Sequence, residues 1–158
     1  MKVNVRKSLK TDVESAFRLC TELKSQEAVY AQLAGTHLKI KRTGKAPNVK
    51  LAISRTMPAN PPGAIRKFVP ATNDVAHTED WAAAGKGFES KIAIDIKGVP
   101  VKIVGTKALQ PEKGGCTVEW NFDVTSGIPL LGSILASFAG EEIRKNLEDE
   151  YKVLKASV

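Results

Sequence analysis

The last thirty residues of the chain carry the pattern that most limits how it can fold. Apolar side chains recur there at steps of three and four residues, while charged side chains fill the opposite face; the apolar set is Leu131, Ile134, Leu135, Phe138, Ile143, Leu147, Tyr151 and Leu154. This spacing predicts an amphipathic helix of about six turns. A helix with one apolar stripe needs another layer of structure to cover that stripe.

Most of the remaining chain alternates between apolar and polar residues, which is the period of a half-buried strand. Seven such runs are predicted, at residues 2–6, 38–41, 49–54, 74–81, 88–97, 101–109 and 116–124. Each run has one polar face and the later connections are short, so neighbouring strands are expected to pair antiparallel. Gly105 interrupts its run and predicts a bulge or a bend.

Two short helices are predicted between the first two strands. Thr11 and Glu14 form a T-x-x-E capping box that starts the first, and the second is expected from Ser25 until Gly35 stops it. We therefore predict a single α+β domain over residues 1–158. In it, a curved seven-stranded antiparallel sheet wraps around the long C-terminal helix.

Composition excludes several function classes. The two cysteines, Cys20 and Cys116, belong to no metal or redox motif, and the first ten residues lack an apolar signal region, which favours a cytoplasmic protein without a disulfide. Only two histidines exist and neither lies near a cysteine, so no metal site is predicted. No nucleotide-binding or hydrolase motif points to a cofactor. The longest uncharged run, residues 124–140, is shorter than the ~20 residues of a membrane span.

Candidate polar site residues lie on the inward faces of two strands. Arg55 continues the apolar face of residues 49–53, and His77 and Glu79 share a face with Trp81. A buried charge is costly unless paired, so we predict an Arg55–Glu79 pair with His77 nearby, which could orient a ligand carboxylate or hydroxyl. The alternatives are a solvated Arg55 at a frayed strand end and a purely structural pair.

Large apolar residues are predicted to form the rest of the site. They lie on inward strand faces or on the helix stripe, and they are Trp81, Phe88, Trp120, Phe122, Leu131, Ile134, Leu135 and Phe138. A curved sheet and one helix are hard to pack without a gap, so these side chains suit an apolar pocket. The alternative for each is ordinary core packing.

The net charge of +7 raises the question of an anionic partner. Basic residues recur on outward strand faces, namely Lys39, Lys41, Lys50, Lys91, Lys97 and Lys102. They could contact nucleic-acid phosphates or an anionic membrane surface. Proteins that bind single-stranded nucleic acid usually carry exposed aromatic residues on which the bases stack, and the outward strand faces of this chain have none. A solvated face without a specific nucleic-acid partner is the preferred interpretation.

Four local features, read together with the order of elements, indicate a family. They are Trp81 closing a strand, the Gly98-Val99-Pro100 hairpin, Gly105 inside the next strand, and residues 128–132 before the final helix. The chain resembles the START/polyketide cyclase/birch-allergen (SRPBCC) superfamily, and within it an uncharacterised family, domain of unknown function 2505. The resemblance implies a helix-grip fold with a cavity for a lipid, polyketide or aromatic molecule.

Three hypotheses follow. The favoured one is a non-enzymatic protein that binds or carries a small hydrophobic ligand between the sheet and the C-terminal helix. The second is a cyclase- or hydrolase-type enzyme that uses His77 or Glu79 as its acid or base. The third is a basic surface module for nucleic acid or an anionic membrane.

Overall fold

Seven strands form one antiparallel sheet in the computed structural model, which describes residues 1–158. The strands are β1 (Lys2–Leu9), β2 (Thr36–Lys45), β3 (Asn48–Pro58), β4 (Thr72–Ala84), β5 (Gly87–Ile96), β6 (Lys102–Glu112) and β7 (Gly115–Thr125). Strands β2 to β7 follow one another as a meander, and β1 pairs with β7, with Val3 opposite Phe122. The predicted fold class and strand number are confirmed.

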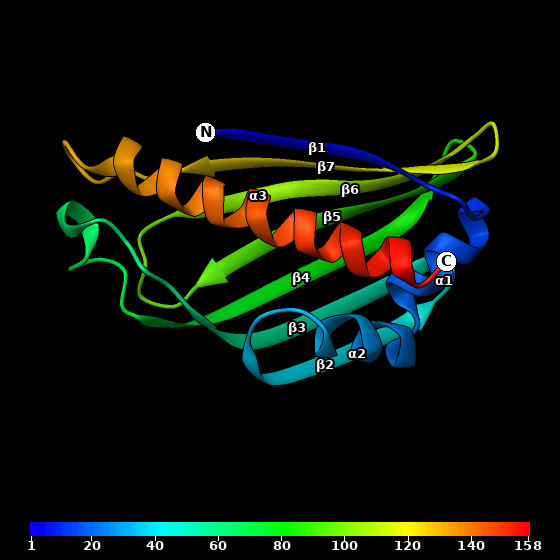
Figure 1. Ribbon diagram of the computed structural model, residues 1–158, viewed down its shortest axis with the longest axis horizontal. Helices are drawn as coiled ribbons and strands as arrows, with labels where there is room; N and C mark the ends of the chain where they lie inside the picture. The colour runs from blue at the N-terminus through cyan, green and yellow to red at the C-terminus, as the bar shows by residue number, and fades with distance from the viewer.

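Helix α3 (Gly132–Ala156) crosses the concave face of the sheet (Figure 1). Its buried residues include Leu135, Ile143, Leu147 and Leu154, which belong to the predicted apolar stripe. The helix is 25 residues long, so it spans most of the curved sheet. None of the helices combines the length and apolar composition needed to cross a membrane.

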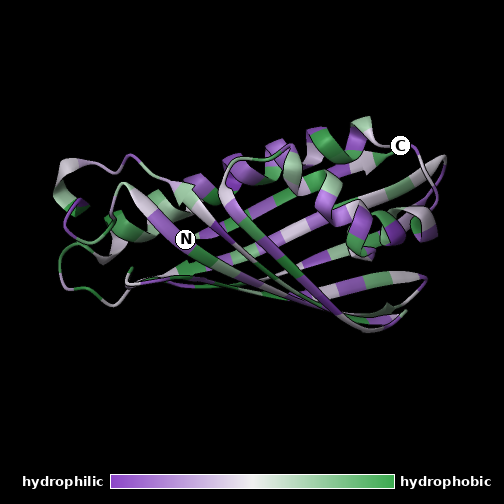
Figure 2. Ribbon diagram, turned by 90° about the horizontal axis from the view of Figure 1, so that it is seen from below, coloured by the Kyte–Doolittle hydropathy of each residue, from purple (hydrophilic) through white to green (hydrophobic).

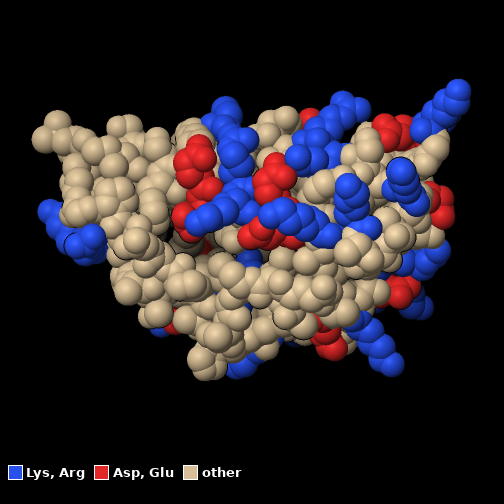
Figure 3. All heavy atoms as spheres, viewed as in Figure 1, with Lys and Arg blue, Asp and Glu red and all other residues tan.

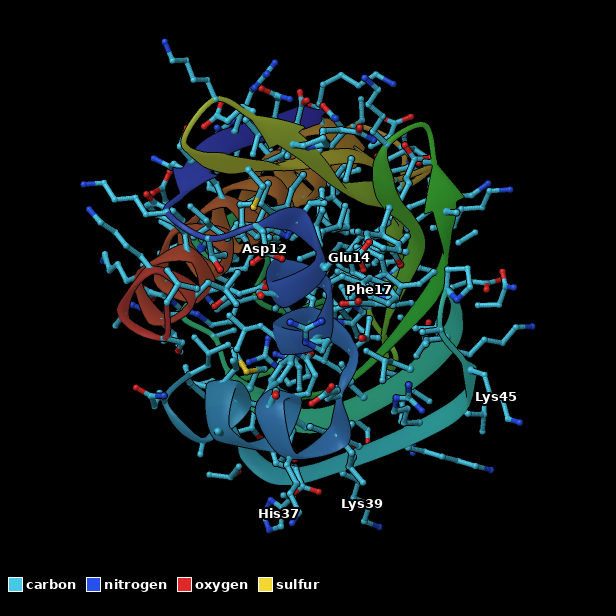
Figure 4. All side chains as sticks on the ribbon, turned by 90° about the vertical axis from the view of Figure 1, so that its right-hand side faces the viewer. Asp12, Glu14, Phe17, His37, Lys39 and Lys45 are labelled. Atoms are coloured by element: carbon cyan, nitrogen blue, oxygen red, sulfur yellow. The ribbon has the colours of Figure 1, made fainter.

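Helices α1 (Val13–Thr21) and α2 (Leu23–Ala31) lie at the end of the sheet away from the start of α3 (Figure 1). Figure 4 looks onto this end and shows Phe17 of α1 pointing inward, whereas Lys39 and Lys45 of β2 point outward. The predicted capping box is wrong. Asp12 caps α1 instead, and its Oδ1 accepts a 2.8 Å hydrogen bond from the Ser15 backbone N–H.

Hydrophobic and hydrophilic residues alternate along the strands (Figure 2), and the buried positions of β1, β3 and β7 recur at every second residue. The sequence predicts a bulge or a bend at Gly105. There is no bulge, because β6 pairs in unbroken register with both neighbouring strands. The glycine instead allows close approach, since a Cβ there would lie 2.3 Å from the Asn121 carbonyl oxygen. The outward lysines predicted from the alternation are all exposed.

The interior is divided into two hydrophobic clusters. The larger contains 27 buried residues and joins the sheet, α1, α2 and most of α3. The smaller contains Ile65, Val69, Val99 and Leu135, and packs at the end where α3 begins. Ile96 and Val101 are partly buried and pack against both clusters.

Candidate functional site

A cavity of about 130 Å³ lies between the concave face of the sheet and α3. Its walls come from both clusters, because Val69, Val99 and Leu135 of the smaller one line it together with Ile103 and Trp120 of the larger. Nineteen of its 28 lining residues are hydrophobic, so the space suits a mainly apolar molecule.

Polar residues line this cavity on two sides, on β4 and on α3, where they are Glu142, Asn146, Asp149 and Glu150. Asn73, Val75, His77 and Glu79 line it at every second position, as expected for one face of a strand. The next residue of that face, Trp81, is fully buried but lies beyond the cavity. The cavity therefore ends near Glu79 and does not reach the α1 end of the sheet.

Glu79 is the most constrained acidic group of the site, with only 3% of the residue exposed. Its Oε2 accepts a 2.7 Å hydrogen bond from Trp81 Nε1, and its Oε1 lies 3.0 Å from His77 Nε2. Burial alone would raise the pKa of the carboxyl, but the charge of Lys107 and the contacts with His77 and Trp81 lower it to about 2. Glu79 is therefore an ionised carboxylate at neutral pH.

His77 lies between Glu79 and Tyr30. Its Nδ1 is 3.4 Å from the Tyr30 hydroxyl. His77 Nε2 is buried 3.0 Å from Glu79 Oε1, which is ion-pair distance, although this contact lacks hydrogen-bond geometry. A polar group that enters the cavity would therefore share this nitrogen with the Glu79 carboxylate.

Lys107 is a buried cation that the sequence analysis did not identify. It is 1% exposed, and its Nζ donates a 2.5 Å hydrogen bond to Glu150 Oε1 on α3 and lies 5.4 Å from the ring centroid of Trp120. Burial would lower the pKa of the amine, but the surrounding groups, among them Glu150 and Glu79, raise it well above its usual value. One lysine thus neutralises acidic groups from both the sheet and α3.

The predicted pair between Arg55 and Glu79 is wrong. In the β3–β4 register Arg55 lies opposite Val75, while Glu79 lies opposite Leu51, so the two charges are four residues apart along the strands. Arg55 instead donates a 2.8 Å hydrogen bond to the Ala34 carbonyl and stacks over the Tyr30 ring at 5.2 Å. It still lines the cavity, at the side formed by the end of α2.

The predicted aromatic residues divide into two groups. Trp120, Phe122 and Phe138 line the cavity, together with Leu135. Trp81 and Phe88 do not, because Phe17 of α1 fills the space beside them. Its ring stacks on Phe88 at 3.9 Å and meets Trp81 edge-on at 5.6 Å.

Two predicted helix residues also lie outside the cavity. Leu131 precedes the first turn of α3 and is half-buried, and Ile134 is 41% exposed. Because α3 begins only at Gly132, the inward position in its first turn falls on Leu135.

Some missed residues carried a readable signal. Lys107 shares its strand face with Ile103 and Leu109, and Glu150 lies on the apolar stripe of α3 between Leu147 and Leu154. A charged residue at such a position indicates a buried, paired group. Asn73, two residues before Val75, could be placed inward by the same reasoning.

No group of three His, Cys, Asp or Glu side chains is arranged to hold a metal ion. The polar groups of the site come instead as a network of two pairs, Lys107 with Glu150 and His77 with Glu79, and the charge of Lys107 also acts on Glu79. Such a network can orient a bound molecule through hydrogen bonds and a local field.

A curved antiparallel sheet that holds a C-terminal helix over a partly polar cavity defines the helix-grip fold of the START/polyketide cyclase/birch-allergen superfamily. Within that class, the chain belongs to the family described as protein of unknown function DUF2505, which matches residues 4–157. No protein with a curated description matches the sequence.

Solved structures with the same fold extend over nearly the whole chain. TTHA0849 from Thermus thermophilus has a TM-score of 0.69 at 16% identity, with 99% of this chain and 95% of that chain covered. The KanY protein (ms6282) has a TM-score of 0.65 at 12% identity, covering 99% and 96%. A conserved protein from Geobacillus kaustophilus has a TM-score of 0.62 at 13% identity, covering 99% and 94%. At these identities the likeness concerns the fold.

Proposed function

We propose that residues 1–158 form one ligand-binding domain that binds or carries a small hydrophobic molecule between the sheet and α3. The observation that carries this proposal concerns two atoms, Asn73 Oδ1 and His77 Nε2. Asn73 Oδ1 is buried without a hydrogen-bond partner, and His77 Nε2 has the Glu79 carboxylate 3.0 Å away without hydrogen-bond geometry; both residues line the cavity. Native proteins rarely leave buried polar atoms unpaired, so a polar group of a ligand would find hydrogen-bonding positions here.

The two atoms also indicate which polar groups a ligand needs and how far apart they would lie. Asn73 Nδ2 already donates a 2.9 Å hydrogen bond to the Pro70 carbonyl. The amide oxygen is therefore the acceptor that still lacks a partner, and it would accept a hydrogen bond from a donor such as a hydroxyl. Four residues of strand separate Asn73 from His77, about 13 Å. A molecule with polar groups at both ends of an apolar body satisfies both atoms, whereas a shorter one satisfies either.

The cavity volume limits the size of the first ligand to test. An apolar engineered cavity of about 150 Å³ stays dry and accepts benzene. The space here is comparable, at about 130 Å³. Lipids or polyketides would require α3 or the adjoining loops to move outward, so a single ring with a hydroxyl is the simplest probe.

The acid/base alternative has less support from the same geometry. A general base works best with a pKa near the working pH. The pKa of Glu79 is about 2, and its oxygens already face Trp81 and His77, so it is a weak base whose oxygens both have partners.

We also propose a cytoplasmic location. Both cysteines are buried and unpaired, which is compatible with it.

The test compares phenol with toluene, which have similar shapes and differ in the hydroxyl. We expect chemical-shift titrations to give tighter binding of phenol, and expect Asn73→Leu combined with His77→Phe to abolish that preference. Phe122→Leu, in the cavity wall, should change both affinities, while its matched control Phe88→Leu, outside the cavity, should change neither. Absence of binding at millimolar phenol, or equal effects of the two phenylalanine variants, would contradict the proposal.

A further inference from the structure

Three connections meet at the end of the sheet where α3 begins, and together they form what we name the loop tip: residues 59–71, 97–101 and 126–131. The first contains the short helix η1 (Gly63–Ile65). The smaller hydrophobic cluster packs them against one another, and Ser126 Oγ donates a 2.7 Å hydrogen bond to the Pro100 carbonyl. The loop tip is therefore an ordered surface whose three connections are held together by their own hydrophobic cluster.

Leu130 is the outlier of this surface. It is 97% exposed, the most exposed large apolar residue of the protein, and its φ is +65°. A left-handed backbone is unfavourable for leucine, and water is an unfavourable place for its side chain. Neither the core nor the cavity gains from this arrangement. Strain of this kind persists at functional positions, and here it aims an apolar side chain outward.

The surroundings of Leu130 are apolar and basic. Ile134, one helical turn further on, is 41% exposed. Residues 59–71, 97–101 and 126–140 contain three basic side chains, Arg66, Lys67 and Lys97, and no acidic one. Figure 3 shows the same contrast: charges of both signs cover the centre of this face, but the end where α3 begins is largely uncharged apart from basic side chains at its extremity.

An exposed apolar side chain beside basic groups complements an anionic bilayer, whose acyl region accepts the one and whose phosphates attract the other. We propose that the loop tip docks onto anionic membranes, with Leu130 inserted among the acyl chains, Ile134 beside it, and Arg66 and Lys67 on the headgroups. Two signals of this kind act together, because one leucine or two basic residues alone bind membranes weakly.

Docking by the loop tip would also place the cavity close to the lipid. Val69, Val99 and Leu135 belong to the core of the loop tip and at the same time line the cavity. An apolar molecule could then pass between bilayer and cavity with a short path through water. The docking itself does not depend on any cavity ligand, so it can be tested on the protein alone.

The experiment is sedimentation with vesicles of phosphatidylcholine containing 30% phosphatidylserine, and with vesicles of phosphatidylcholine alone. We expect binding to the first kind at low salt, weakened in 0.5 M NaCl and much weaker on the neutral vesicles. Leu130→Gly should reduce binding by about tenfold or more. Its Tm should not fall, because glycine tolerates the positive φ. Leu130→Phe should retain binding, as should Val104→Ser, which changes an exposed apolar residue on β6.

A matched pair of double variants locates the basic part of the surface. Arg66→Gln/Lys67→Gln should lose binding, whereas Lys39→Gln/Lys41→Gln, which removes the same charge from the outward face of β2, should retain it. The proposal is overturned if no vesicle binds at low salt, if Leu130→Gly binds like the parent, or if the β2 pair is the one that matters. If the loop tip binds no vesicles, a protein partner would be the alternative explanation for its exposed leucine.

Discussion

Trp81 Nε1 donates a 2.7 Å hydrogen bond to Glu79 Oε2, and both residues are almost completely buried on the concave face of β4. The bond connects the cavity to the packed end of the sheet, because Glu79 lines the cavity while Trp81 contacts Phe17 of α1. It holds the carboxylate in one orientation, with the other oxygen toward His77. The stability of the fold and the polarity of the cavity therefore depend on the same carboxylate.

Protonation of Glu79 should destabilise the protein in acid. Its pKa is about 2 in the folded protein against an ordinary value of 4.5, so its contribution is complete above pH 4.5 and is lost as the pH falls toward 2. The shift corresponds to about 3 kcal/mol. Urea unfolding between pH 2 and 7 should show that Glu79→Gln costs stability at neutral pH and little near pH 2. A stability difference that is constant with pH would refute this.

Removal of the Lys107 charge should be costly, because it leaves Glu79 and Glu150 buried without their cation. We expect Lys107→Met to lower the free energy of unfolding by about 3–5 kcal/mol. Lys91→Met, on the exposed face of the neighbouring strand β5, is the matched control and should change it by less than about 0.5 kcal/mol. Denaturant unfolding at pH 7 measures both. Similar values for the two variants would show that Lys107 is not the charge centre described.

Gly105→Ala should destabilise the sheet. The added Cβ would lie 2.3 Å from the Asn121 carbonyl oxygen and 2.5 Å from the Phe122 ring, and the backbone oxygen cannot move without disturbing the β6–β7 pairing. We expect a loss of about 1–3 kcal/mol. Gly63→Ala is the control, because a Cβ there meets nothing within 4 Å. Thermal unfolding of the two variants provides the comparison, and equal Tm values would contradict the prediction.

Cys20 should be unreactive in the folded protein. The residue is 1% exposed, and burial raises the pKa of its thiol to about 11, so the thiolate is scarce at pH 8. In a Cys116→Ser background, we expect Ellman's reagent to react only as fast as the protein opens, and faster as urea is added. Rapid reaction in native buffer, at a rate independent of urea, would count against a buried thiol.

Sequence patterns were sufficient for the fold because they are local. Alternation from Val3 to Val124 marks strands whichever neighbours they have, and the three- and four-residue steps after Leu131 mark a helix. Errors arose where two local signals competed. At the start of α1, Thr11 with Glu14 and Asp12 with Ser15 offer adjacent caps, and the structure uses the second.

The candidate site was predictable only in part. The inward direction of His77, Glu79 and Phe122 follows from strand alternation, which is a property of the backbone. Which inward residues meet does not follow, because that depends on register between strands. The β3–β4 register separates Arg55 from Glu79, and no pattern within either strand determines it.

The sequence by itself therefore determined the element types, their order and the face on which most strand side chains lie, because these depend on periods of two and 3.6 residues along one chain. Only the tertiary structure decided where the interior remains open. Phe17 fills the space beside Trp81 and Phe88 at one end, and α3 turns Leu135 inward and Ile134 outward at the other. Packing between elements leaves the cavity beside Asn73 and His77, and the connection before α3 holds Leu130 exposed at a positive φ; the chain pattern reveals neither.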